Sequence, residues 1–141
     1  MERIGDIVCC QLRVNFLCCD GVQENYDLEK NVVTLRGTAG YEAHCEYDEH
    51  GRLIHFQNSY GYQEWREYNE QGREVHYFNS RGQQFWADYD KRGNKIYYKD
   101  SNGYEEKAVY NELNRIVSYR NSLGVEFNEN NGVYFLNERR V

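Results

Sequence analysis

The sequence of 141 residues contains no proline and has no excess of positive charge. Without proline, the chain lacks the commonest residue at helix starts and the commonest stiffener of turns. The net charge of −6 disfavours nucleic acid and anionic membranes as direct partners, because their phosphates attract basic proteins. No apolar run is long enough for a transmembrane helix. The N-terminal stretch MERIGDIVCCQLR does not have the pattern of a secretory signal, and we expect a cytoplasmic protein.

Cysteine is present, but its number and spacing do not predict disulfides or a metal site. The five cysteines are Cys9, Cys10, Cys18, Cys19 and Cys45. An odd number without an export signal predicts free thiols in a reducing compartment. The two CC pairs lack the C-x2-C spacing of the usual zinc knuckles, so we expect small buried apolar residues rather than metal ligands.

Tyrosine is abundant, with 14 residues, and recurs at regular intervals. From Tyr41 to Gly124 the chain divides without a gap into four segments of 21 residues, of which the second reads YQEWREYNEQGREVHYFNSRG. Position 7 is always tyrosine, position 8 alternates between Asp and Asn, position 16 is aromatic and position 21 is glycine. A degenerate copy precedes this array at 20–40, and a further copy begins at Val125 and fades after Phe127. Such periodicity is typical of stacked repeats.

Each repeat contains two strand-like runs and two turn signals, Y-[DN]-x-x-G and N-S-x-G. The sequence therefore predicts an all-β fold, an antiparallel meander of 21-residue β-hairpin repeats with about ten strands over 20–131. Asn114 replaces the turn glycine in the fourth repeat, and we expect the turn to persist because Asn tolerates left-handed geometry. Residues 1–19 are expected to form N-terminal capping strands, and residues 132–141 a C-terminal cap.

The motif Tyr47-Asp48-Glu49-His50-Gly51-Arg52-Leu53, followed by Gly61, resembles the YD repeat of Rhs and teneurin-type proteins. Weaker copies begin at Tyr68 and Tyr89. In large members of that family such hairpins spiral into a hollow shell around a toxin, so the resemblance implies a hairpin array. Five or so copies are too few to close a shell. A looser resemblance links the chain to the MORN-like repeats of some antitoxin proteins, which share a Tyr/Gly-rich hairpin of similar length.

The alternation of side chains along a strand assigns each repeat two faces. If position 7 pairs with position 12, the tyrosine shares one face with the Ile or Val of position 14 and the aromatic of position 16. Identical side chains would then stack as a structural ladder. The tyrosines of this ladder are Tyr26, Tyr47, Tyr68, Tyr89 and Tyr110.

On the opposite face, positions 4 and 15 are expected to oppose each other across the hairpin, and their residues vary between repeats. They form a stripe of His55, Trp65, His76, Trp86 and Tyr97. Trp and Tyr are enriched at binding hot spots, so the stripe favours partner binding; the alternative is a second core. Residues 41–82 hold eight acidic and four basic side chains. The expected acidic contributors to binding are Glu46, Glu64, Glu67 and Glu74.

No motif indicates catalysis, and we expect no enzyme, no cofactor and no metal. The repeated serines lie in turns, and glycine recurs singly rather than in a phosphate-binding loop. The sequence predicts a non-enzymatic protein-binding module, an acidic inhibitor whose partner is another protein such as a basic nucleic-acid-binding effector. A phage anti-defence protein, for example an anti-CRISPR, fits this description. The alternatives are an antitoxin or immunity protein, a metalloprotein using Cys and His, and a glycan-binding array on the aromatic stripe.

Overall fold

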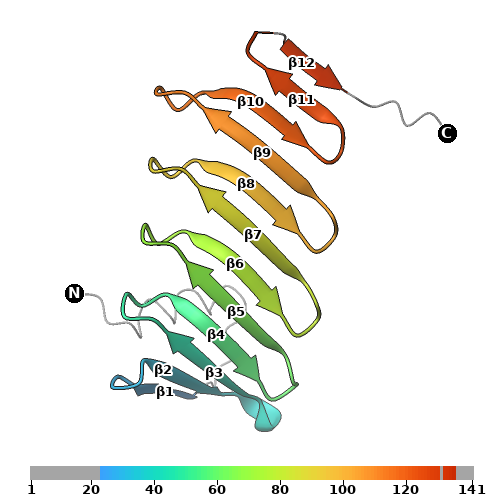
Figure 1. Cartoon of the computed structure of the whole chain (residues 1–141). Helices are drawn as coiled ribbons and strands as arrows, with labels where there is room; N and C mark the ends of the chain where they lie inside the picture. Colours follow the sequence, from blue (N-terminus) through green and yellow to red (C-terminus); the bar gives the residue numbers. More distant parts are fainter. Residues whose placement is uncertain (1–22, 131, 136–141) are drawn as a thin grey trace, which may run out of the picture. The chain divides into compact units, whose positions relative to one another are not determined.

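The computed structural model describes residues 23–130 and 132–135, and its strands form one antiparallel sheet (Figure 1). Twelve strands in these residues follow one another in sequence order, each hydrogen-bonded to its neighbours in the chain. The only helix described is a 3-10 turn at Thr38–Gly40. The predicted all-β meander is therefore confirmed: eleven of the described strands lie within 20–131, where about ten were expected, and the twelfth, Gly132–Phe135, lies in the segment predicted as a C-terminal cap. The predicted cap at 1–19 lies outside the described residues, as do residues 136–141.

The strands recur at the same two places in every repeat. The first strand of each hairpin covers positions 2–7, in β3 (Glu42–Tyr47), β5 (Gln63–Tyr68), β7 (Gln84–Tyr89) and β9 (Glu105–Tyr110). The second covers positions 13–18, in β4 (Leu53–Asn58), β6 (Glu74–Asn79), β8 (Lys95–Asp100) and β10 (Ile116–Asn121). The flanking strands are β1 (Gln23–Asp27), β2 (Val32–Arg36), β11 (Val125–Asn128) and β12 (Gly132–Phe135). The period of the sequence is thus also the period of the structure.

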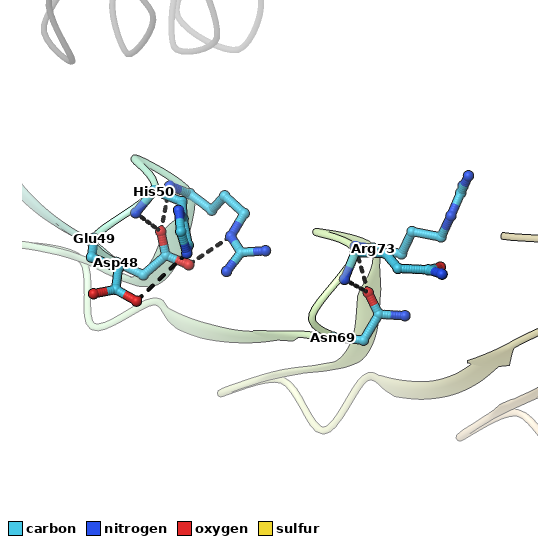
Figure 2. Close-up of polar contacts among 7 residues, drawn as sticks. Asp48, Glu49, His50, Asn69 and Arg73 are labelled. Carbon is cyan, nitrogen blue, oxygen red and sulfur yellow. Dashed lines mark hydrogen bonds and ion pairs between the residues drawn. The ribbon is translucent and has the colours of Figure 1, made fainter. Parts of the chain in front are cut away.

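The turn inside each hairpin is closed by the acid or amide at position 8. Oδ1 of Asp48 accepts hydrogen bonds from the backbone N–H groups of His50 and Arg52, both at 2.9 Å (Figure 2). Oδ1 of Asn69 accepts the equivalent bond from Arg73 at 3.0 Å. Position 11 needs a positive φ, and Asn114 supplies 58° where the other three repeats have glycine. The expected persistence of this turn is confirmed.

The turn between hairpins uses Asn and Ser in the same way. Oδ1 of Asn58 accepts bonds from the N–H groups of Tyr60 and Tyr62, at 3.0 and 3.1 Å. Ser59 then ties this turn to the start of its own hairpin, because its Oγ accepts the N–H of Glu42 at 3.0 Å and its N–H donates to the carbonyl of Glu42 at 2.8 Å. The repeated serines therefore serve turn geometry.

The register of the hairpins differs from the one expected. Tyr47 pairs with Leu53 and Tyr89 with Lys95, so position 7 lies opposite position 13 and not position 12. The N–H of Asp48 donates to the carbonyl of Arg52, which uses position 12 to close the turn. A β-bulge follows, and the extra residue places the side chain at position 13 on the same face as the tyrosine.

The first compact unit, which ends at Trp65, contains the buried apolar cluster. Its buried members alternate along β2, β3 and β4 and are Val33, Leu35, Ala43, Cys45, Tyr47 and Phe56. Leu53 packs against this cluster because the bulge turns it inward. We call the face of the sheet that carries this cluster, with its equivalent positions in later repeats, the ladder face.

The second unit begins at Arg66, and its described ladder face is mostly half-buried. Aromatic rings contact one another in the order Tyr77, Phe85, Tyr98 and Tyr104, with centroids 5.7, 5.6 and 6.0 Å apart. The first and last of these contacts join position 16 to positions 3 and 1 of the following repeat, and the middle contact joins positions 3 and 16 of one repeat. Tyr89 and Tyr110, which share position 7, form no ring stack with each other. The expected stacking of identical residues is therefore wrong for this pair.

The reason lies in the register between strands. His76 pairs with Trp86, and Trp86 pairs with Lys99 rather than with Tyr97. Tyr97, the equivalent of His76, lies two residues further along the sheet, opposite Asp88. Lys107 likewise pairs with Tyr97 on one side and Arg120 on the other. The third and fourth repeats are therefore each displaced by two residues, or about 7 Å, along the strand direction relative to the repeat before. Equivalent side chains consequently do not face one another across the sheet.

Candidate functional site

The stripe expected from the sequence lies on the face opposite the ladder face, which we call the stripe face. In the first unit, His55 of β4 lies opposite Trp65 of β5. The two rings stack with centroids 5.1 Å apart and an interplanar angle of 11°. On the other side of the imidazole, Oε2 of Glu46 lies 3.6 Å from Nδ1 of His55. This unit thus presents a carboxylate, an imidazole and an indole in a row.

The second unit repeats this arrangement with His76 and Trp86. Their ring centroids are 5.1 Å apart with an interplanar angle of 13°. Oε1 of Glu67 lies 3.6 Å from Nδ1 of His76. Trp86 retains 37% of its surface, so the indole is open to solvent. The ring of His76 is also stacked on Phe78, with centroids 5.2 Å apart.

The pairing within the stripe differs from the expected one. Positions 4 and 15 were expected to oppose each other across one hairpin, which for the first repeat means His44 and His55. The register instead places His44 opposite Gln57 and Glu46 opposite His55. The aromatic pairs instead join the second strand of one hairpin to the first strand of the next. The N–H of Asn58 donates to the carbonyl of Tyr62 and thereby sets this register between hairpins.

The last predicted member, Tyr97, has a lysine as its partner. Lys107 occupies the place that Trp65 and Trp86 hold in earlier repeats and lies opposite Tyr97. Its Nζ is 5.4 Å from the centroid of the Tyr97 ring and 3.4 Å from Oε1 of Glu105. The stripe therefore changes from His–Trp stacks to a cation over an aromatic ring.

The four expected carboxylates divide between the two faces. Glu46 and Glu67 flank the stripe, and their side chains are 51% and 64% exposed. Glu64 lies opposite the core residue Phe56 and accepts a bond from the hydroxyl of Tyr62 at 2.8 Å. The carboxylate of Glu74 is 3.4 Å from Arg66, whose guanidinium lies over the Tyr77 ring. Glu64 and Glu74 thus belong to the ladder face, and Glu74 stands at position 13, which a bulge turns over in the hairpins β3–β4 and β7–β8.

A polar network on the ladder face was not expected from the sequence. Glu106 accepts hydrogen bonds from the hydroxyls of Tyr104 and Tyr119 at 2.8 and 2.9 Å and lies 2.7 Å from Nζ of Lys95. Burial opposes its ionisation, but these donors outweigh burial and lower the pKa of Glu106. Its bond with Tyr119, burial and the nearby carboxylate raise the pKa of Tyr104. The network holds three strands together rather than presenting a reactive group. The bulge, which turns Lys95 toward Glu106, has no signature in the residue pattern.

Cys45 is the one cysteine that the structure describes, and it is fully buried. Burial raises the pKa of its thiol to about 11, so the reactive thiolate is scarce at neutral pH. The other four cysteines lie outside the described residues. Within 23–130 and 132–135, no group of three or more His, Cys, Asp or Glu side chains could hold a metal ion.

No family model matches the chain, and no similar protein was found among curated proteins. The resemblances to YD repeats and to MORN-like repeats therefore stay predictions based on the motif residues. The described part of the chain includes no helix that could cross a membrane.

Proposed function

We propose that the chain is a non-enzymatic protein-binding module that occupies a basic surface of another protein. The observation that carries this proposal is the repeated row of carboxylate, imidazole and indole, Glu46–His55–Trp65 and Glu67–His76–Trp86. Each row stands on two adjoining hairpins whose turns are fixed by side-chain hydrogen bonds. Rigid aromatic anchors on a regular scaffold lose little conformational entropy when they bind.

Charge supports a basic partner. The net charge of −6 and the exposed Glu46 and Glu67 attract a positively charged surface and raise the rate of encounter. A protein surface that binds nucleic acid is basic, and an acidic protein that covers this surface blocks the binding of nucleic acid. We therefore propose an inhibitor of a nucleic-acid-binding effector, with a phage protein directed against a bacterial defence nuclease as the proposed setting.

The test is affinity capture from a bacterial lysate with matched baits, followed by binding measurements on the purified partner. The baits are the wild type, the double variant Trp65→Ala and Trp86→Ala, and the control Leu113→Ala, which alters a turn residue that is 73% exposed. We expect one basic protein on the wild-type and control baits that is absent from the double variant. Each alanine should weaken its binding by about 2 kcal/mol, and added nucleic acid should compete.

The proposal fails if the folded double variant captures the same proteins as the wild type. It also fails if the purified partner binds equally fast at low and high salt, since steering between charged surfaces is screened by salt. Circular dichroism of every bait excludes unfolding as the cause of lost binding.

A further inference from the structure

Four residues on the stripe face of the second unit run in a row from an acid to a base. In the backbone register His76 lies opposite Trp86, and Trp86 lies opposite Lys99. On the other side of His76, the carboxylate of Glu67 is 3.6 Å from the imidazole. Successive strands β5 to β8 therefore present Glu67, His76, Trp86 and Lys99 in that order. The row consists of a carboxylate, two stacked aromatic rings and an ammonium group.

The charged ends of this row are not paired with each other, in contrast to the charges of the ladder face. There, Arg66 and Glu74 pair at 3.4 Å, and Lys95 and Glu106 at 2.7 Å. Lys99 lies opposite Glu105 of β9 in the backbone register, but the carboxylate of Glu105 pairs with Lys107 at 3.4 Å. Lys99 forms no ion pair with any residue that the structure describes, and Glu67 reaches only the imidazole of His76. Three strand spacings, about 14 Å, separate Glu67 from Lys99, so the two side chains cannot meet within one chain.

A second copy of the row that runs in the opposite direction would pair with the first, carboxylate against ammonium and ring against ring. A two-fold axis parallel to the strands, passing between β6 and β7, turns a second copy face to face with the first and reverses the row. Glu67 then faces Lys99 of the partner subunit, and His76 faces Trp86 of the partner subunit. A two-fold axis creates each of these contacts twice. We infer that the chain forms a symmetric dimer through the stripe face of β5–β8, and that the occupant of this face is a second copy.

The Glu67 end of the row suits the basic partner proposed above, whereas the Lys99 end adds a feature that a second copy matches. A basic surface would meet Glu67 favourably but would be repelled by Lys99, whereas a second copy satisfies both ends. The four six-residue strands form a face of about 19 by 20 Å, or about 400 Å², which is half of the roughly 800 Å² per partner of a standard interface. The dimer is accordingly a weak one that forms at high protein concentration. The dimer uses the same Glu67, His76 and Trp86 that the proposed function assigns to a basic partner, so the second copy and that partner compete for this face. The test of the dimer needs only the chain itself, so it succeeds or fails separately from the proposed function.

Sedimentation equilibrium of the purified full chain tests the dimer, over concentrations from about micromolar to about millimolar, the range in which weak interfaces associate. The variants are Glu67→Lys, Lys99→Glu, the double charge exchange of both, and an equimolar mixture of the two single variants. Glu112→Lys and Lys91→Glu are the controls, since they make the same charge changes in exposed turns. Circular dichroism establishes that each variant is folded.

We expect each single variant to weaken the dimer about tenfold or more, because symmetry places two repulsive pairs in the interface. The double exchange and the mixture of single variants should both restore association, while the two controls should leave it within about twofold. A wild type that stays monomeric throughout the range overturns the inference. So does a folded double exchange that remains as weak as the single variants, because the Glu67–Lys99 contact would then be absent.

Discussion

Asp48 and Asn69 stand at position 8 of successive repeats and close their turns with the same pair of hydrogen bonds. Each Oδ1 accepts the N–H groups two and four residues later, at 2.9 Å for Asp48 and 3.0 Å for Asn69 (Figure 2). The turn therefore needs the oxygen and not the charge. Because Asp and Asn alternate at position 8, the chain contains the same turn closed by an ionisable side chain and by a neutral one.

Replacing Asp48 and Asp90 by Asn should reduce the sensitivity of the fold to acid. At Asp48, burial opposes ionisation, but hydrogen bonds from His50 and Arg52 and the Arg52 charge outweigh it and lower the pKa. At Asp90, the side-chain hydrogen bond from Asn94 is the main cause of a lowered pKa. A carboxyl whose pKa is lower in the folded state stabilises the fold above its unfolded value, about 3.9, and loses that contribution as pH falls through the folded value.

Thermal unfolding followed by circular dichroism between about pH 2 and pH 7 measures this effect. The melting temperature of the wild type should fall with decreasing pH below about 4, and the double Asn variant should fall less steeply. Glu112→Gln, in an exposed turn, serves as the control and should leave the slope unchanged. Identical acid slopes for the wild type and the double Asn variant would contradict the role assigned to the two carboxylates.

Alanine substitutions at Gly82 and Gly93 compare the loss of unfolding free energy at two turn residues that both have a positive φ. Both are left-handed, at 81° and 85°, but an added Cβ meets nothing at Gly82, whereas at Gly93 it meets the guanidinium of Arg73. Either alanine should cost about 1–2 kcal/mol of unfolding free energy for the backbone. Gly93→Ala should cost about 0.5–1 kcal/mol more, because Arg73 must leave its position over the Tyr89 ring.

Urea denaturation of both variants, alone and combined with Arg73→Ala, measures the two contributions separately. In the Arg73→Ala background the extra cost at Gly93 should disappear and the cost at Gly82 should not change. If the difference between the two glycines persists without the guanidinium, it does not come from Arg73.

Cys45 should resist alkylation in the native protein at about pH 8 and react once the chain is unfolded, because the thiolate is the reactive form. Its side chain has no exposed surface, and burial raises its pKa to about 11. Iodoacetamide labelling with and without denaturant, mapped to the peptide that contains Cys45, measures this protection. Labelling of Cys45 at the same rate in both conditions would show that β3 opens readily.

The strand positions and turns were predictable because they depend on local chemistry. An Asp or Asn that can bond to the backbone, followed three residues later by Gly51 or its equivalent, specifies a turn without reference to the rest of the chain. The repeat then places every strand. Membership of the stripe, including His76 and Trp86, also followed from this alternation.

The register of strand pairing was not predictable from the sequence. The other differences between the expected and the observed arrangement of side chains follow from this register. Whether position 12 joins the strand or closes the turn depends on the bond between the N–H of Asp48 and the carbonyl of Arg52, which involves no side-chain type. The resulting bulge places Leu53 and Lys95 on the ladder face. The pairing between hairpins depends in the same way on the bond from the N–H of Asn79 to the carbonyl of Gln83. That bond decides that His76 meets Trp86 instead of a residue of its own hairpin.

Lys107→Trp should extend the stripe by one aromatic pair. Lys107 holds the same position in its repeat as Trp86, and Tyr97 holds the position of His76, so the new indole should stack on Tyr97 as Trp86 stacks on His76. The substitution removes a cation–π contact worth about 0.5–1 kcal/mol and adds an aromatic pair worth about 0.5–1.5 kcal/mol. Unfolding free energy from urea denaturation should therefore stay within about 1 kcal/mol of the wild type. Lys107→Ala, which offers neither contact, should be the less stable of the two variants. Equal stability of the two variants, or a folded Lys107→Trp protein whose new indole fluoresces as if fully in water, would show that stacking in the stripe is particular to His–Trp pairs.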